Sequence, residues 1–166
     1  VWLNGNGDQA PTPMGLAAAD MFAGHFLVQG LVAAMVKVLK TGIGSHVQTR
    51  LMEALLDFQF EVLTTYLNNG KRKPKRSSYN NAHAYLAAPY GIYKTSDSYI
   101  AISMTPIPKL GELINLDTLK QYEKPEDAFT KRDEIKKLIG DYIVKETTQH
   151  WLDILQPADI WCAEVL

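Results

Sequence analysis

A long apolar run near the N-terminus constrains this chain more than any other feature. Residues 17–39 consist mainly of Ala, Leu, Val, Met and Phe, and Asp20 is the only acidic residue among them. Apolar residues sustained over this length predict one long helix, and Gly42 shortly after the run suits a helix C-cap. Because a loop rich in Gly and Pro precedes the run, the helix is expected to begin near Ala17. Asp20 is therefore predicted to lie in the first helical turn.

The same run is about as long as a membrane span. It contains His25, Gln29, Lys37 and two glycines, and these favour a buried core helix of a globular protein. The composition agrees, since 46% of the 166 residues are hydrophobic and 21% are charged. A net charge of −1 argues against a general nucleic-acid-binding protein. The single cysteine allows no internal disulfide and predicts a cytoplasmic protein.

The chain divides into three parts and is expected to be an internal piece of a larger protein, because no initiator Met stands before Val1. Residues 1–70 are predicted to be a helical segment of a large domain, with a second amphipathic helix at about 46–67. Residues 71–83, "KRKPKRSSYNNAH", are predicted to be a basic linker. Residues 84–166 mix strand and helix patterns, and predict a small α/β domain that is incomplete at its C-terminus.

Within this small domain, "YGIYKTSDSYIAISM" predicts two strands around a turn at residues 96–98. The stretch "TKRDEIKKLIGDYIVKE" predicts an amphipathic helix, and Thr130 with Asp133 resembles a capping box at its start. Thr148 is predicted to be the N-cap of a further helix, "QHWLDIL". The stretch "IWCAEVL" is predicted to be a final strand.

Asp20 is the first candidate for chemistry. A carboxylate in the first turn is favoured by the helix dipole, so a structural role alone accounts for its position. The functional alternative is that the carboxylate, set among small residues, stays ionised and accessible. It could then act as a covalent nucleophile on an acyl carbon, or as an acid/base. Gly24, one turn further on, would let a bulky ligand approach closely.

The other polar motifs are weaker. The chain has no histidine or cysteine spacing typical of a metal site, and no metal is expected. Cys162 lies in an apolar stretch and is interpreted as a small core residue. The basic linker is most simply a solvated segment, and contact with an anionic partner such as a phosphorylated cofactor is the alternative. The four histidines, which are too scattered for a metal site or a nucleophilic triad, are His25, His46, His83 and His150.

Six stretches, in order, carry a family likeness: "PTPMGLAAADMFAG", "KTGIGSHV", "LMEALL", "APYGIYKTSDSYIAI", "TKRDEIKKLI" and "WLDILQPADIWCAEV". They resemble the class III CoA-transferases, the family of formyl-CoA transferase, L-carnitine CoA-transferase (L-carnitine dehydratase/bile acid-inducible protein F) and α-methylacyl-CoA racemase. The likeness covers nearly the whole chain. It implies an α/β fold with a large nucleotide-fold-like domain and a small α/β domain. It also implies a homodimer of two interlocked chains.

The resemblance implies roles for individual residues. The family's "G-x-x-x-x-D-x-x-x-G" stretch falls on Asp20 and Gly24. In the transferases this aspartate attacks the acyl-CoA carbonyl and forms a mixed anhydride. The released CoA thiolate then leaves an aspartyl-CoA thioester, and the acceptor acid collects the CoA. In the racemases the matching aspartate belongs to an acid/base pair whose histidine would precede Val1.

The resemblance also implies a cofactor-binding loop. Asn81 and His83 fit the family's "G-N-x-H-P" stretch, whose glycine is absent here, and Ser98 stands in the turn where a glycine is common. The implied substrates are an acyl-CoA and a carboxylic acid, with coenzyme A as the carried group and no nucleic-acid or membrane partner. The isolated chain is not expected to catalyse CoA transfer. The alternatives are an acyl-CoA racemase or epimerase, and a non-catalytic interaction module.

Overall fold

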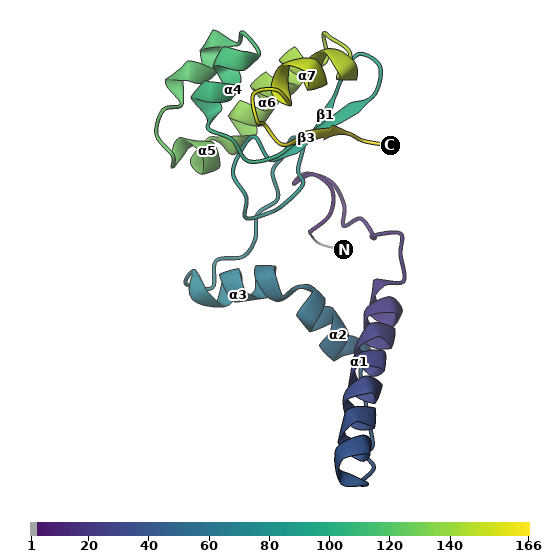
Figure 1. Ribbon diagram of the computed structural model, residues 1–166. Helices are drawn as coiled ribbons and strands as arrows, with labels where there is room; N and C mark the ends of the chain where they lie inside the picture. The colour runs from purple at the N-terminus through teal and green to yellow at the C-terminus, as the bar shows by residue number, and fades with distance from the viewer. Residues whose placement is uncertain (1–2) are drawn as a thin grey trace. The chain divides into compact units, whose positions relative to one another are not determined.

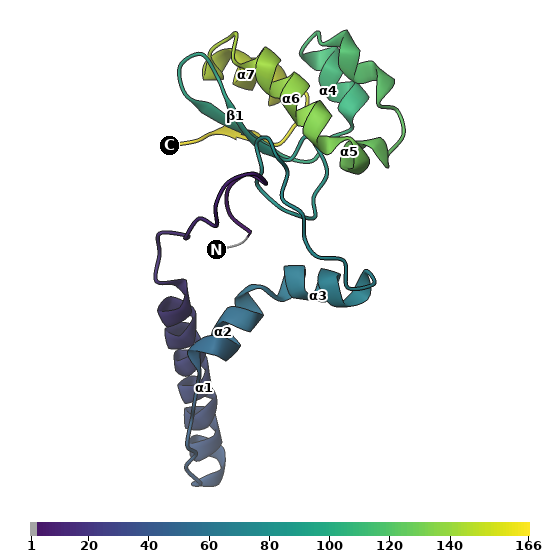
Figure 2. The same ribbon diagram turned by 180° about the vertical axis from the view of Figure 1, so that it is seen from behind.

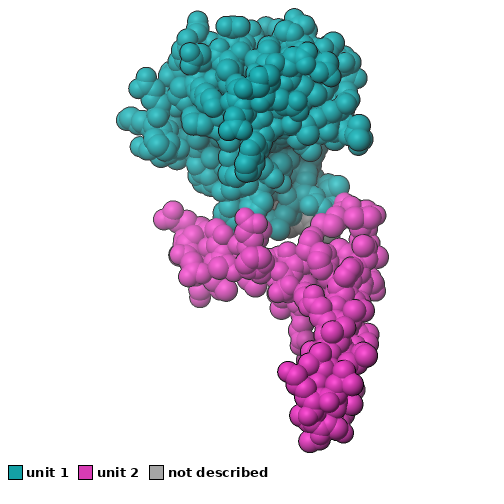
Figure 3. Space-filling model, viewed as in Figure 1, with its two compact units in different colours: residues 1–12, 74–166 teal, residues 13–73 magenta. Residues whose placement is uncertain are grey.

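The computed structural model describes residues 3–166 (Figures 1 and 2). The chain forms two compact units, which Figure 3 colours separately. The helical unit comprises Pro13–Lys73, and the sheet unit comprises Pro74–Leu166 together with the chain up to Thr12. The sheet unit thus includes the N-terminal residues and most of the predicted linker, which the sequence pattern had kept apart from it.

Helix α1, Ala18–Thr41, confirms the long helix predicted from the apolar run. Gly42 ends it in the left-handed region (φ 71°), and its backbone N–H donates to the last turn (2.8 Å). The segment after Gly42 lies against α1, because a Cβ placed on Gly30 would come within 2.5 Å of Val47 Cγ1. Glycine at position 30 therefore permits this close approach.

The predicted helix over about His46–Leu67 is wrong in its start and its continuity. Two helices occupy this region, α2 at Leu51–Phe58 and α3 at Phe60–Asn68. They are separated at Gln59, which has φ −99° and ψ 14°. Its backbone N–H (3.2 Å) and its side-chain amide (3.0 Å) both donate to the carbonyl of Leu55. The apolar stripe continues through the break, so periodicity alone did not reveal it.

The apolar surface of α1 is exposed in the part of the chain that the structure describes. Ala23 is the only buried residue in this helix, and Leu39 is 84% exposed. By length and composition the helix could cross a membrane, although the core helix of a soluble protein passes the same test. The sequence predicted a buried helix, but residues 3–166 do not bury it.

The sheet unit contains a three-stranded antiparallel sheet in the order β1-β2-β3. Strands β1, Gly91–Lys94, and β2, Tyr99–Ile102, confirm the predicted strand pair. Strand β3, Cys162–Glu164, confirms the predicted final strand. Between β1 and β2 the chain turns where predicted, and the N–H of Thr95 donates to the carbonyl of Ser98 (3.0 Å).

Helices cover one face of this sheet. Helix α6, Arg132–Ile143, packs on β1, and helix α7, Thr148–Leu155, packs on β3 (Figure 1). Three further helical segments complete the unit: α4 at Ile107–Leu113, η1 at Asp117–Gln121 and α5 at Asp127–Thr130. The core between sheet and helices includes the buried side chains of Tyr93, Ile100, Ile102, Leu110, Leu119, Ile135, Ile139, Ile143, Trp151 and Leu155.

The predicted capping box at the start of α6 is wrong. Thr130 Oγ1 donates to the carbonyl of Glu126 (2.9 Å) and does not cap α6. Asp133 Oδ1 instead accepts hydrogen bonds from Ser77 Oγ (2.7 Å) and the N–H of Ser78 (3.0 Å). The carboxylate is therefore used in a contact between residues far apart in sequence.

The predicted N-cap of α7 is also displaced by one residue. Thr147 is the N-cap, and its Oγ1 accepts from the N–H of His150 (3.2 Å). Thr148 is buried, and its N–H donates to Asp97 Oδ1 (2.8 Å). This backbone hydrogen bond, supported by the hydroxyls of Thr148 and Thr95, lowers the pKa of Asp97. The turn between β1 and β2 is thereby attached to the start of α7.

Helix α6 buries a lysine. Lys136 has no exposed surface, and its Nζ donates to the carbonyl of Asn80 (3.1 Å). Burial, with repulsion from Arg132 added, lowers the pKa of Lys136 to about 8, while Asp133 acts in the opposite direction. A lysine in an unfolded chain has a pKa of about 10.4. The folded chain therefore releases this proton at a lower pH than the unfolded chain.

The free energy of unfolding should consequently rise as the pH increases from about 8 to about 10, because only the unfolded chain keeps the Lys136 proton in this window. Below about pH 8 both states bind the proton and this contribution is constant. Urea unfolding at several pH values should show the rise in the wild type and not in Lys136→Met. Lys137→Met changes an exposed neighbour and is the control. Identical pH profiles for the wild type and Lys136→Met would contradict the expectation.

Candidate functional site

Asp20 lies in the first turn of α1, as predicted. Its side chain is exposed, and no hydrogen bond or ion pair within residues 3–166 engages its carboxylate. The N-cap residue, Ala17, provides no side-chain hydrogen bond to the helix end. The first backbone N–H groups of a helix lack partners within the helix, and together with the helix dipole they favour negative charge. The carboxylate is thus exposed at a helix N-terminus and open to an electrophile.

Gly24 lies one turn after Asp20, on the same face of α1. It has no positive φ, and a Cβ at this position would meet no atom within 4 Å. Nothing in the described chain therefore requires glycine at position 24, and the space beside it is open to a ligand. The neighbouring His25 is engaged with the helix itself, since its Nδ1 donates to the carbonyl of Met21 (2.7 Å).

Asn81 lies in the sheet unit, where it joins two distant parts of the chain. Its Oδ1 accepts from the N–H of Ser77 (3.0 Å), and its Nδ2 donates to the carbonyl of Gly5 (3.0 Å). Its backbone N–H donates to Asn6 Oδ1 (3.0 Å). These bonds give the Asn81 side chain a structural role. A cofactor could use only its second amide hydrogen and the second lone pair of its oxygen.

His83 lies two residues further on and is half-buried. Its Nδ1 accepts a hydrogen bond from the backbone N–H of Tyr85 (3.2 Å). Because a backbone N–H can only donate, Nδ1 carries no proton, and the neutral ring has its proton on Nε2. The His83 Nε2–H is therefore a hydrogen-bond donor.

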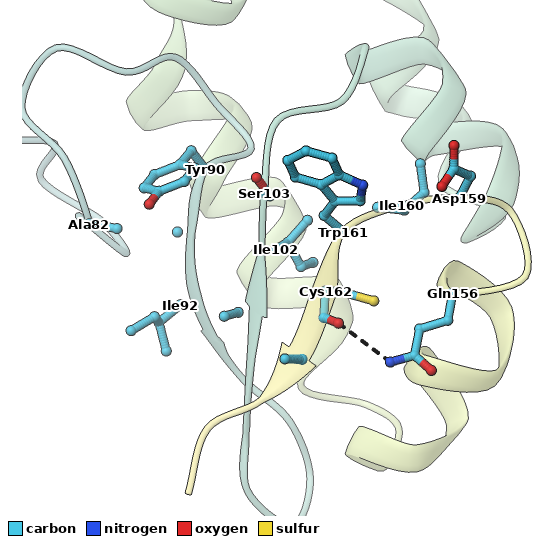
Figure 4. A pocket seen from close by; sticks show the side chains of 13 residues that line it. Ala82, Tyr90, Ile92, Ile102, Ser103, Gln156, Asp159, Ile160, Trp161 and Cys162 are labelled. Carbon is cyan, nitrogen blue, oxygen red and sulfur yellow. Dashed lines mark hydrogen bonds between the residues drawn. The ribbon is translucent and has the colours of Figure 1, made fainter.

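A pocket of about 660 Å³ lies on the sheet, beside the turn at Ala82 (Figure 4). Ala82, between Asn81 and His83, is part of its lining. The lining is mostly apolar, and Gln156 and Asp159 are among its few polar residues. A volume of this size is typical of small-molecule sites.

The sequence pattern did not predict the aromatic and aliphatic residues of this pocket. Trp161 is 72% exposed and Ile92 is 43% exposed, and both line the pocket with Tyr90. Ile92 alternates with the buried Tyr93 along β1, so its face was implied by the strand pattern. Trp161 immediately precedes the short strand β3, and three residues are too few to show which face it takes.

The basic run "KRKPKR" is less open to an anionic partner than its composition suggests. Arg76 is buried, and its guanidinium donates to the carbonyls of Asn4 and Gln9 (2.7 Å to the latter). Lys73 and Lys75 are exposed. The alternative of a phosphorylated-cofactor contact therefore depends on the exposed residues of this run and not on Arg76.

The four predicted site residues form two pairs in the structure. Asp20 and Gly24 share one face of α1 in the helical unit. Asn81 and His83 share one turn in the sheet unit, next to the pocket. The first pair combines an accessible carboxylate with open space, and the second lies in a turn beside an apolar cavity.

The sequence model of CoA-transferase family III matches residues 1–166, so the chain belongs to this family. It is 24% identical over 161 residues to succinyl-CoA:glutarate CoA-transferase of Homo sapiens, and 25% identical over 160 residues to acetyl-CoA:oxalate CoA-transferase of Acetobacter aceti. These matches cover 93% and 92% of this chain, but 35% and 40% of the two relatives. The chain thus spans less than half the length of these curated relatives.

The chain is also similar to a solved structure of a CAIB/BAIF family protein from Brucella suis. The TM-score is 0.76 at 22% sequence identity, and the match covers 99% of this chain and 44% of that one. This likeness confirms the predicted α/β fold class, in which helices accompany a small antiparallel sheet.

Replacement of Gly24 should separate stability from ligand binding. Gly24→Ala should raise the free energy of unfolding by about 0.5–1 kcal/mol, because alanine is the better helix former and no atom obstructs its Cβ. If a CoA ester occupies the space beside Asp20, the same change should weaken its binding by about tenfold, which is about 1.4 kcal/mol. Urea unfolding and calorimetric titration measure the two effects.

Gly44→Ala is the matched control, since a Cβ at Gly44 also meets no atom within 4 Å. It should leave ester binding unchanged. A loss of stability in Gly24→Ala would contradict the open geometry described around this glycine.

Proposed function

We propose that this chain supplies the nucleophilic aspartate of a CoA-transferase, which moves CoA between an acyl-CoA and a carboxylic acid. The observation that carries the proposal is the exposed carboxylate of Asp20 at the N-terminus of α1, without a partner in the described part of the chain. The names of the relatives support a class of acceptor: glutarate and oxalate are short dicarboxylic acids, while the named donors are succinyl-CoA and acetyl-CoA. Short dicarboxylic acids are the proposed acceptors, and the CoA esters of short acids are the proposed donors.

In the proposed reaction a carboxylate oxygen of Asp20 attacks the acyl carbon of the thioester. A C–O bond forms and the C–S bond breaks, giving a mixed anhydride and the CoA thiolate. The thiolate then attacks the aspartyl carbon of the anhydride and releases the donor acid as its carboxylate. The resulting aspartyl-CoA thioester reacts with the acceptor carboxylate by the reverse of these steps. Each step exchanges one anion for another, so the sequence needs no net proton or electron.

The environment of Asp20 suits this chemistry. The N–H groups of the first helical turn favour the attacking carboxylate, and they would also favour the negative charge that develops on the thioester oxygen. Gly24 leaves room for the ester beside the carboxylate. Asn81 and His83 are proposed to contact the CoA ester.

The same proposal includes the carried group, the partner chain and the location of the protein. Coenzyme A is the carried group, a second copy of the protein is the partner in an interlocked homodimer, and the location is cytoplasmic. Cys162 fits a structural role better than a nucleophilic one, because burial raises the pKa of its thiol.

Trapping of the covalent intermediate tests the proposal. Incubation of the full-length protein with succinyl-CoA and hydroxylamine should convert Asp20 into a hydroxamate, which mass spectrometry detects on the Asp20 peptide. Asp20→Asn should lower the rate of transfer by about a thousandfold or more, because the amide cannot replace the carboxylate as nucleophile. Asp57→Asn is the matched control on an exposed aspartate of α2 and should keep wild-type activity.

Transfer that survives Asp20→Asn would refute the proposal. Loss of deuterium from the α-carbon of an acyl-CoA, without transfer of CoA and without the hydroxamate, would identify a racemase or epimerase instead. A non-catalytic module would show neither reaction. In that case Asp20→Ala would only remove a favourable charge from the helix end, at a cost of about 0.3–1 kcal/mol.

A further inference from the structure

The segment that contains Asn81 and His83 belongs to no helix or strand, and helix α6 holds it through its backbone. Lys136 is fully buried, and its Nζ donates to the carbonyl of Asn80 (3.1 Å). In return, the side-chain amide of Asn80 donates to the carbonyl of Lys136 (3.4 Å). These reciprocal bonds hold Asn80 at a positive φ of 47°, which is uncommon for a residue other than glycine.

Arg132, one turn earlier on α6, holds the two ends of the same segment. It is 6% exposed, and its Nη1 donates to the carbonyl of Ala84 (2.7 Å). Its Nη2 donates to the carbonyl of Lys75. Because both acceptors are backbone carbonyls, these bonds set the course of the chain and not the orientation of particular side chains. The spacing of four residues places Arg132 and Lys136 on one face of the helix.

An ion pair does not explain the burial of Lys136. Arg132 on the same helix repels it, and Asp133 is the carboxylate that acts on it favourably. Asp133, however, accepts its hydrogen bonds from Ser77 and Ser78, within the segment itself. A buried cation without a close carboxylate contributes little net stability, because desolvation offsets its hydrogen bonds. What Lys136 contributes is a defined backbone position for Asn80.

Two glycines leave the space in which Asn80 lies. A Cβ at Gly91 on β1 would come within 2.5 Å of the Asn80 carbonyl oxygen. A Cβ at Gly140 on α6 would come within 2.9 Å of Asn80 Nδ2. Asn80 is therefore enclosed by a strand and a helix with no room for movement toward either. The turn that follows it is placed by the most regular elements of the sheet unit.

We propose that Arg132 and Lys136 are positioning residues for recognition of the CoA ester, which fix the turn containing Asn81 and His83 beside the pocket lined by Ala82. They act through backbone carbonyls and touch no substrate. The role in recognition of the CoA ester rests on the proposed function. The positioning of the turn by α6 rests only on the geometry of the sheet unit. Structure and activity therefore need separate measurements.

Hydrogen exchange of the amides of residues 77–85 measures the hold on the turn without any activity. Lys136→Met should raise the exchange rates of these amides by about tenfold or more, while the amides of β2 and α7 keep theirs. Lys137→Met, on the exposed side of α6, should change none of them. A uniform increase over the whole sheet unit, or no increase at residues 77–85, would overturn the inference.

Gly140→Ala tests the same contact without removal of a charge. Alanine favours the helical conformation of α6, so the unit should keep its thermal stability. Its Cβ would press on Asn80 Nδ2, and exchange should again become faster at residues 77–85 only. Gly44→Ala is the control, because its Cβ enters open space. Wild-type exchange in Gly140→Ala would count against the enclosed position of Asn80.

In transfer assays, Lys136→Met and Gly140→Ala should raise KM for the acyl-CoA by about tenfold and leave kcat nearly unchanged, because they act on recognition and not on Asp20. Arg132→Lys, which keeps a donor, should be affected less than Arg132→Met. A wild-type KM combined with faster exchange would overturn the proposed role in recognition. If the full-length wild-type protein transfers no CoA, the proposed function fails, and the exchange measurements still decide whether α6 positions the turn.

Discussion

The structure of the sheet unit depends on helix α6, which supplies the core and holds the irregular segment at the same time. Ile135, Ile139 and Ile143 are fully buried against the sheet, and burial of each such side chain contributes about 1.5–3 kcal/mol. The same helix buries Arg132 and Lys136, whose hydrogen bonds go to backbone carbonyls of residues 75–84. Apolar burial fixes the helix on the sheet, and the fixed helix then determines where the polar segment can run.

The environment of Asp20 is the opposite of that of the buried Arg132 and Lys136. Its carboxylate is exposed at a helix N-terminus, where no desolvation has to be offset and the helix dipole favours the charge. The buried cations of α6, Arg132 and Lys136, are shielded from solvent and donate to backbone carbonyls. They are therefore suited to positioning the chain. An exposed anion beside the open space at Gly24 is suited to bond formation. These two environments agree with the proposed roles, in which Asp20 reacts and the turn containing His83 takes part in recognition.

Local patterns predicted the elements whose cause is local. The apolar run predicted α1 and its end at Gly42, and strand alternation predicted β1 and β2. The position of Asp20 in the first turn was predicted on the same grounds. The break at Gln59 and the partners of Asp133 were not, because the stripe of α2 and α3 is continuous and Ser77 lies far from Asp133 in sequence. The pocket beside Ala82 was also missed, since it needs three separate strands to form.

By itself the sequence determined the family, the α/β class and the residue proposed to react, because motif order and periodicity are properties of neighbouring residues. Only the tertiary structure decided what holds the turn that contains Asn81 and His83. Asn81 reads as a ligand in the sequence, yet its side chain binds Ser77 and Gly5. Lys136 reads as one more charge on an amphipathic helix, yet it is buried beneath Asn80. Such contacts join residues that are close only after folding, and no local pattern records them.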